Sequence, residues 1–70
     1  MKTFLGIDVG SVTTKLAVID SAGRLMSHVY RSTQGNPAAA LKLALAELEG
    51  RLPAGAEIAG VAATGSARRL

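Results

Sequence analysis

A carboxylate, several hydroxyl groups and a lysine lie together in one short stretch near the start of the chain. Residues 8–15 read DVGSVTTK. Asp8 could hold Mg²⁺, and Lys15 could bind phosphate oxygens. Further hydroxyl donors to phosphate lie between them, at Ser11, Thr13 and Thr14. Gly10 has no Cβ, so its backbone can approach a ligand, and the N–H groups of a tight turn can surround an anion. The stretch therefore predicts a site for the phosphate tail of a nucleotide.

This stretch differs from two familiar glycine-rich phosphate loops. It contains neither G-x-x-x-x-G-K-[ST] nor G-x-G-x-x-G. The alternative interpretation is a plain hairpin whose second strand is rich in solvated threonines.

The composition excludes several other kinds of site. The chain has 70 residues, no cysteine and one histidine, which excludes disulfides, thiolate metal sites and a histidine-rich metal cage within it. Its net charge of +3 comes from scattered basic residues, and it has one Tyr, one Phe and no Trp, so we expect no nucleic-acid partner. No stretch reaches the roughly 20 apolar residues of a membrane span. Because Asp8 interrupts the first apolar run, no signal peptide is expected either, and we predict a cytoplasmic protein without a membrane partner.

Two strands must position Asp8 and its neighbours. The short apolar run Thr3–Val9 predicts a buried strand, and the β-branched run Val12–Asp20 predicts a second. The tight connection between them predicts a hairpin. The sequence Asp20-Ser21-Ala22-Gly23 suits a type I turn, which leads into a third strand over Arg24–Thr33.

A helix and a fourth strand follow. Asn36 suits the N-cap and Pro37 the first helical position, which predicts a helix from Pro37 to about Gly50. We expect its core stripe to consist of Leu41, Leu45, Leu48 and Leu52. The side chains expected on its solvated or far side are Lys42, Leu43, Glu47 and Glu49. The apolar run Ile58–Thr64 predicts the last strand.

The order β-β-β-α-β predicts an α/β fold with a mixed sheet of strand order 3-2-1-4. The helix would make a right-handed crossover, and the fourth strand would run parallel to the first. The run Ile58–Thr64 would then be an apolar open edge, and one sheet face would have no helix over it. We therefore expect residues 1–70 to be an incomplete, marginally stable N-terminal part of one nucleotide-binding domain.

The same residues resemble a known superfamily. Gly6-Ile7-Asp8-Val9-Gly10-Ser11 looks like the first phosphate motif of the acetate kinase, sugar kinase, heat-shock-70 and actin superfamily, on a hairpin at the start of a ribonuclease H-like domain. More narrowly, residues 6–15 (GIDVGSVTTK) resemble the start of the ATPase activators of 2-hydroxyacyl-CoA dehydratases and benzoyl-CoA reductases. The fourth strand of these activators ends in a Thr-Gly-Tyr-Gly-Arg-like turn. Thr64-Gly65-Ser66-Ala67-Arg68 stands at that place, with Ser and Ala where the activators have Tyr and Gly.

The resemblance implies an ATP-hydrolysing activase, a homodimer that couples ATP to electron transfer from a [4Fe-4S] cluster to an acyl-CoA dehydratase. ATP and Mg²⁺ are its implied cofactors, and Asp8 its implied catalytic residue and metal ligand. The implied phosphate contacts are Gly10, Ser11, Thr13, Thr14, Lys15, Thr64 and Gly65. The cysteines that hold the cluster are absent from this sequence. We expect the 70 residues alone to lack ATPase activity.

Other functions remain open from the sequence. A sugar or N-acetylhexosamine kinase of the same superfamily, a non-catalytic actin- or chaperone-like ATP switch and a partial product without activity are the alternatives. Paired cysteines encoded downstream would favour the activator, and a sugar-binding Asp motif would favour the kinase. Thr64-Gly65 could equally be a strand end followed by a helix cap. His28 and the pair Arg68-Arg69 are expected to be solvated.

Overall fold

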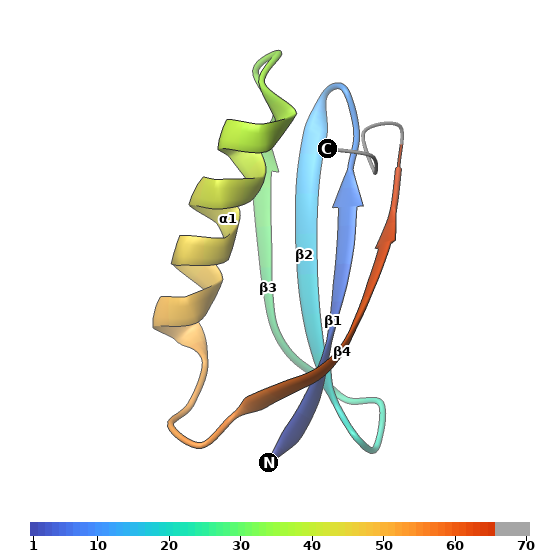
Figure 1. Ribbon diagram of the computed structural model, residues 1–70, viewed down its shortest axis with the longest axis vertical. Coiled ribbons are helices and arrows are strands. Elements are labelled where there is room, and N and C mark those ends of the chain that lie inside the picture. The colour runs from blue at the N-terminus through green and yellow to red at the C-terminus, as the bar shows by residue number, and fades with distance from the viewer. Residues whose placement is uncertain (66–70) are drawn as a thin grey trace.

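Four strands and one helix follow one another in the order β-β-β-α-β (Figure 1). They are β1 (Lys2–Val9), β2 (Thr13–Asp20), β3 (Leu25–Ser32), α1 (Pro37–Arg51) and β4 (Glu57–Thr64). The computed structural model describes residues 1–65. Every predicted element is confirmed, and each end lies within one residue of its predicted position. The predicted solvated pair Arg68-Arg69 lies outside the described residues.

The sheet is mixed, with the strand order β3-β2-β1-β4 that the sequence predicts. The pairs β1–β2 and β2–β3 are antiparallel, and β1–β4 is parallel. A tight turn joins β2 to β3: the Gly23 N–H donates to the Asp20 carbonyl at 3.0 Å. Oδ1 of Asp20 accepts the N–H groups of Ala22 and Arg24, each at 2.9 Å. Asp20 is therefore a turn residue, as expected.

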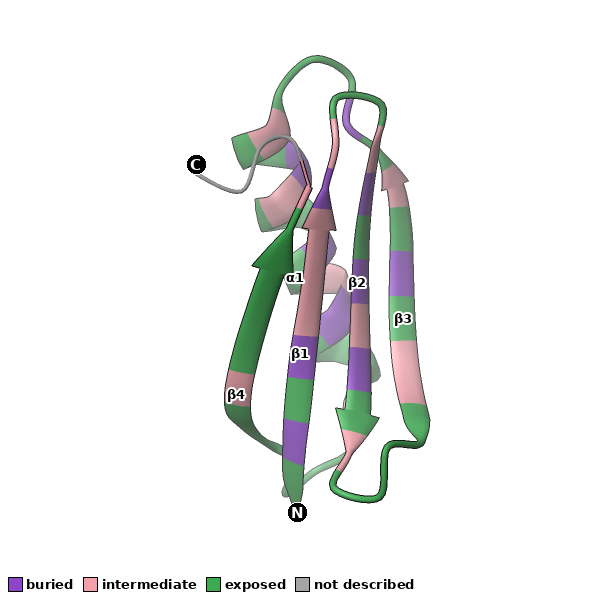
Figure 2. Cartoon of the chain, turned by 90° about the vertical axis from the view of Figure 1, so that its right-hand side faces the viewer, coloured by how far each residue is buried: buried purple, intermediate pink, exposed green. Residues whose placement is uncertain are grey.

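The core lies between the sheet and α1, which packs over β2 and β3. Side chains alternate across each strand, so every second residue of β1 and β2 faces the helix, and Figure 2 shows the resulting buried bands. The core cluster consists of Leu5, Leu16, Val18, Val29, Ala44 and Leu48. We call the sheet surface away from α1 the open face, because no helix of residues 1–65 covers it.

The helix begins as the sequence predicts but buries a different row of residues. Asn36 caps it, since its Oδ1 accepts the Ala39 N–H at 3.2 Å, and Pro37 follows in the first turn. The buried helical residues are Ala40, Ala44 and Leu48. The predicted leucine stripe is confirmed in part: Leu48 is buried, and Leu41 and Leu52 are partly buried and pack against the core cluster. It is wrong for Leu45, which is exposed. Alanines facing the sheet let the helix lie close to it, which spreads the leucines to its flanks. Leu43 is exposed, as predicted.

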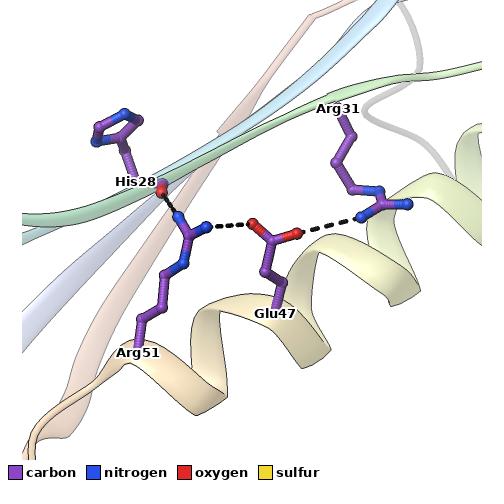
Figure 3. A network of polar contacts seen from close by, with 4 residues as sticks. All are labelled: His28, Arg31, Glu47 and Arg51. Carbon is purple, nitrogen blue, oxygen red and sulfur yellow. Dashed lines mark hydrogen bonds and ion pairs between the residues drawn. The ribbon is translucent and has the colours of Figure 1, made fainter.

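Glu47 is only partly solvated and is held in ion pairs, which corrects the prediction that it lies on the solvated face of the helix. Its carboxylate bridges two arginines, with Oε1 at 3.2 Å from a guanidinium nitrogen of Arg31 and Oε2 at 2.9 Å from one of Arg51 (Figure 3). Arg51 also donates to the main-chain carbonyl of His28 at 2.8 Å. The network therefore ties α1 to β3. His28 itself is exposed, as expected.

Within residues 1–65, the helix α1 is neither long enough nor apolar enough to cross a membrane.

Candidate phosphate-binding site

The tip of the β1–β2 hairpin is held in place by Thr33. Within the hairpin, the Gly10 N–H donates to the Thr13 carbonyl at 2.8 Å. From the end of β3, the Thr33 N–H donates to the Val12 carbonyl at 2.8 Å and its hydroxyl to the Gly10 carbonyl at 2.9 Å. Among residues 1–65, the N–H groups of Ser11 and Val12 have no hydrogen-bond acceptor. The exposed tip therefore offers two main-chain donors to an anion.

Asp8 lies near the end of β1, which is one of the two inner strands of the sheet. It is directly opposite Lys15 on β2 and directly beside Thr64 on β4. Because residues paired across strands face the same side of a sheet, these three side chains share the open face, and alternation along β2 places Thr13 there too. A hollow of about 390 Å³ lies at this position, lined by Gly6, Ile7, Asp8, Lys15, Leu16, Ala17, Ala62, Ala63 and Thr64. Its wall is predominantly apolar, and the residues with polar side chains that line it are Asp8, Lys15 and Thr64.

Gly65 brings the end of β4 against Asp8. Its φ is +101°, in the left-handed region that favours glycine. A Cβ at this position would lie 2.7 Å from Oδ1 of Asp8 and 2.5 Å from the Val9 carbonyl oxygen, too close for any side chain. Thr64 is the last residue of β4, so the predicted strand end is confirmed. Of the predicted Thr64-Gly65-Ser66-Ala67-Arg68 turn, Ser66 and the two residues after it lie outside the described part of the chain.

Thr14 is separated from the other predicted phosphate contacts. It is fully buried on the helix side of β2, and its hydroxyl lies 2.9 Å from that of Thr33. The structure thus gathers four predicted residues around one place, namely Asp8, Lys15, Thr64 and Gly65, and puts Thr13 on the same face of the sheet. It places Gly10 and Ser11 in the adjoining hairpin tip.

Two residues at this end of the sheet were not found from the sequence. Thr33 holds the hairpin tip, and Tyr30 holds Lys15, whose ammonium lies 5.6 Å from the ring centre. Alternation along the third strand could have placed Tyr30 on the open face. No sequence signal pointed to Thr33, because its contacts join residues that are distant along the chain.

The residues of this site fit a magnesium–phosphate complex. In residues 1–65, no group of three or more His, Cys, Asp or Glu side chains could hold a metal by itself. Mg²⁺ commonly uses only one or two carboxylates and takes its other ligands from substrate phosphates and water, so Asp8 alone is sufficient on the protein side. A [4Fe-4S] cluster does not fit this chain, which has no cysteine.

Comparisons with known proteins identify no relatives. No family model matches the chain, and no curated protein or solved structure matches it.

Proposed function

We propose that this chain binds the phosphate groups of a Mg²⁺-bound nucleotide at the hairpin end of its sheet. The observation that carries the proposal is the position of Asp8, which shares a hollow on the open face with Lys15 and Thr64 and lies against the backbone of Gly65. A carboxylate with an ammonium, a hydroxyl and nearby N–H donors supplies ligands for both the metal and the phosphates.

Each group has a distinct part in this proposal. Asp8 would hold the Mg²⁺, which neutralises phosphate charge when bound. Lys15 and the N–H groups of Ser11 and Val12 would bind phosphate oxygens, and the Thr64 hydroxyl would donate a further hydrogen bond. Gly65 would leave the carboxylate accessible, because no side chain there can stand over it. Thr14 acts indirectly, by holding Thr33 and thereby the hairpin tip.

A finer proposal rests on the resemblance of residues 6–15. In this proposal the chain is the N-terminal segment of a cytoplasmic, ATP-hydrolysing activator of an acyl-CoA dehydratase, with a ribonuclease H-like domain. The strand order β3-β2-β1-β4 and the hairpin that carries Asp8 support it. The [4Fe-4S] cluster and the homodimer around it would depend on residues beyond these 70, since the chain has no cysteine.

Binding can be tested with the chain itself. ¹⁵N-labelled residues 1–70 would be titrated with ATP and with pyrophosphate, each with and without Mg²⁺, while the amide signals are followed by NMR. We expect Mg²⁺-dependent shifts at Ser11, Lys15 and Gly65 and much smaller shifts at the opposite end of the sheet. Pyrophosphate should reproduce the shifts, because the proposed contacts are to phosphate groups.

The decisive variant is Asp8→Asn, which removes the charge and keeps the shape. It should weaken Mg²⁺–ATP binding by more than about tenfold. Asp20→Asn is the matched control, because Asp20 lies at the far end of β2 and an asparagine there can still accept both turn hydrogen bonds. Equal affinity in Asp8→Asn and the parent chain, or no Mg²⁺ dependence in the parent, would refute the proposal.

A further inference from the structure

Lys15 lies between two competing partners in one row across the sheet. Its direct partner on β1 is Asp8, and its direct partner on β3 is Tyr30. Since directly paired residues face the same side of a sheet, all three side chains stand on the open face. Figure 2 shows the three strands side by side. The lysine side chain can therefore turn either to a carboxylate or to an aromatic ring.

The structure contains the contact with the ring. The ammonium of Lys15 lies 5.6 Å from the centre of the Tyr30 ring, within the range of a cation–π interaction. No ion pair joins it to Asp8 within residues 1–65. Both Lys15 and Tyr30 are exposed, and at exposed positions ion pairs and cation–π contacts are weak and of similar strength. Removal of the ring is therefore enough to turn the ammonium toward Asp8.

An ion pair between Asp8 and Lys15 would compete with the ligand for both groups. The nearby positive charge would weaken the attraction of the carboxylate for Mg²⁺. The ammonium would at the same time be less available to phosphate oxygens. A side chain that keeps the two groups apart therefore favours binding without contacting the ligand.

On the basis of the proposed function, we propose that Tyr30 is a positioning residue of the phosphate site. Its ring holds the Lys15 ammonium on the β3 side of the row until phosphate groups bind. Because the contact with the ring is weak, the stronger charge-assisted bonds to phosphate draw the ammonium away from it. The ring acts through Lys15 alone and does not touch the nucleotide.

An NMR measurement tests the contact without any ligand. The face of an aromatic ring shifts the signals of nearby protons upfield, so the ε-methylene protons of Lys15 should be shifted upfield in residues 1–70. Tyr30→Phe keeps a ring and should keep this shift, whereas Tyr30→Thr should lose it. Mg²⁺ and pyrophosphate should reduce the shift in the parent, because the ammonium leaves the ring. A parent chain without the upfield shift would overturn the proposal.

The affinity for pyrophosphate in the presence of Mg²⁺ tests the role itself. Tyr30→Thr should weaken binding by about two- to fivefold, and Tyr30→Phe should bind as the parent does. Leu25→Thr is the matched control, because it removes a similarly exposed side chain from the far end of the same strand. In a Lys15→Gln background, Tyr30→Thr should cause no further loss, since the ring acts only through that lysine.

The outcomes separate this role from direct binding and from the proposed function. A loss seen with ATP but not with pyrophosphate, or one that persists in the Lys15→Gln background, would show that the ring contacts the ligand and would overturn the proposal. Equal affinities of Tyr30→Thr and a parent that binds would refute the role of Tyr30 and leave the proposed function standing. A parent that binds neither ligand would refute both. If Tyr30→Thr does not fold by circular dichroism, the ε-methylene shift of the parent and its response to ligand decide.

Discussion

The ammonium of Lys15 lies 5.6 Å from the centre of the Tyr30 ring, although its direct partner across the sheet is Asp8. In the described part of the chain, ion pairs join Glu47 to its two arginines and none joins Asp8 to Lys15. An aromatic face attracts a cation without supplying a negative charge. The carboxylate and the ammonium are therefore not paired with each other, which leaves one available to a metal and the other to a phosphate.

Lys15→Gln should reduce the affinity for Mg²⁺–ATP by about tenfold, because it removes a charged donor to phosphate. The fold should not change, since the side chain is exposed. Lys42→Gln, on the exposed side of α1, is the control for net charge. Titration of the two variants by isothermal calorimetry checks this, and equal affinities would show that Lys15 does not contact the ligand.

Gly65→Ala should lower the free energy of unfolding by about 1–3 kcal/mol, because its positive φ disfavours a side chain. The added methyl group should also displace Asp8 and weaken Mg²⁺–ATP binding. Gly50→Ala is the control: it lies in α1, where nothing is within 4 Å of an added Cβ, and should raise stability by up to about 1 kcal/mol. Urea unfolding of both variants measures the contrast, and equal effects would contradict the strain assigned to Gly65.

Thr33→Val should destabilise the protein by about 1–3 kcal/mol, because it leaves the buried Thr14 hydroxyl and the Gly10 carbonyl without a partner. Thr64→Val removes a hydroxyl of the same type from an exposed position and should change stability by less than about 0.5 kcal/mol. Thermal unfolding of the two variants tests the difference. A Thr33→Val variant as stable as the parent would show that the hairpin tip does not depend on this residue.

Glu47→Gln should cost about 0.5–1 kcal/mol, because its two ion pairs are partly solvated and therefore weak. Glu49→Gln, at an exposed position on the same helix, should have almost no effect. The difference between the two variants should shrink in high salt, which screens the pairs. Urea unfolding at low and high salt measures it. A loss that does not depend on salt would mean that Glu47 acts through packing.

The strands and their order could be predicted because their signals are local. Short apolar and β-branched runs gave the strands, and the tight hairpin fixed β1 against β2. A helix between β3 and β4 then left a parallel position beside β1. The face shared by Asp8 and Lys15 follows from the same alternation, once the hairpin register is known.

The helix packing and the supporting contacts could not be predicted in the same way. Several rows of apolar residues overlap on α1, and helical periodicity alone does not tell whether leucines or alanines face the sheet. Ala44 is fully buried because the helix lies close to β2 and β3, a distance that no pattern encodes. Glu47 pairs with Arg31, 16 positions away, and Thr33 bonds to Thr14, 19 positions away, so these contacts appear only when the chain is folded.

Thr33 has a consequence for how the molecule could respond to a ligand. Its main-chain and side-chain bonds join the hairpin tip to the segment that leads into α1, and its carbonyl also accepts the N–H of Asn36, the helix cap, at 3.1 Å. The tip and the first turn of the helix are thus mechanically coupled through a single residue. A ligand that displaces the tip would therefore act directly on the hydrogen bonds that set the start of α1.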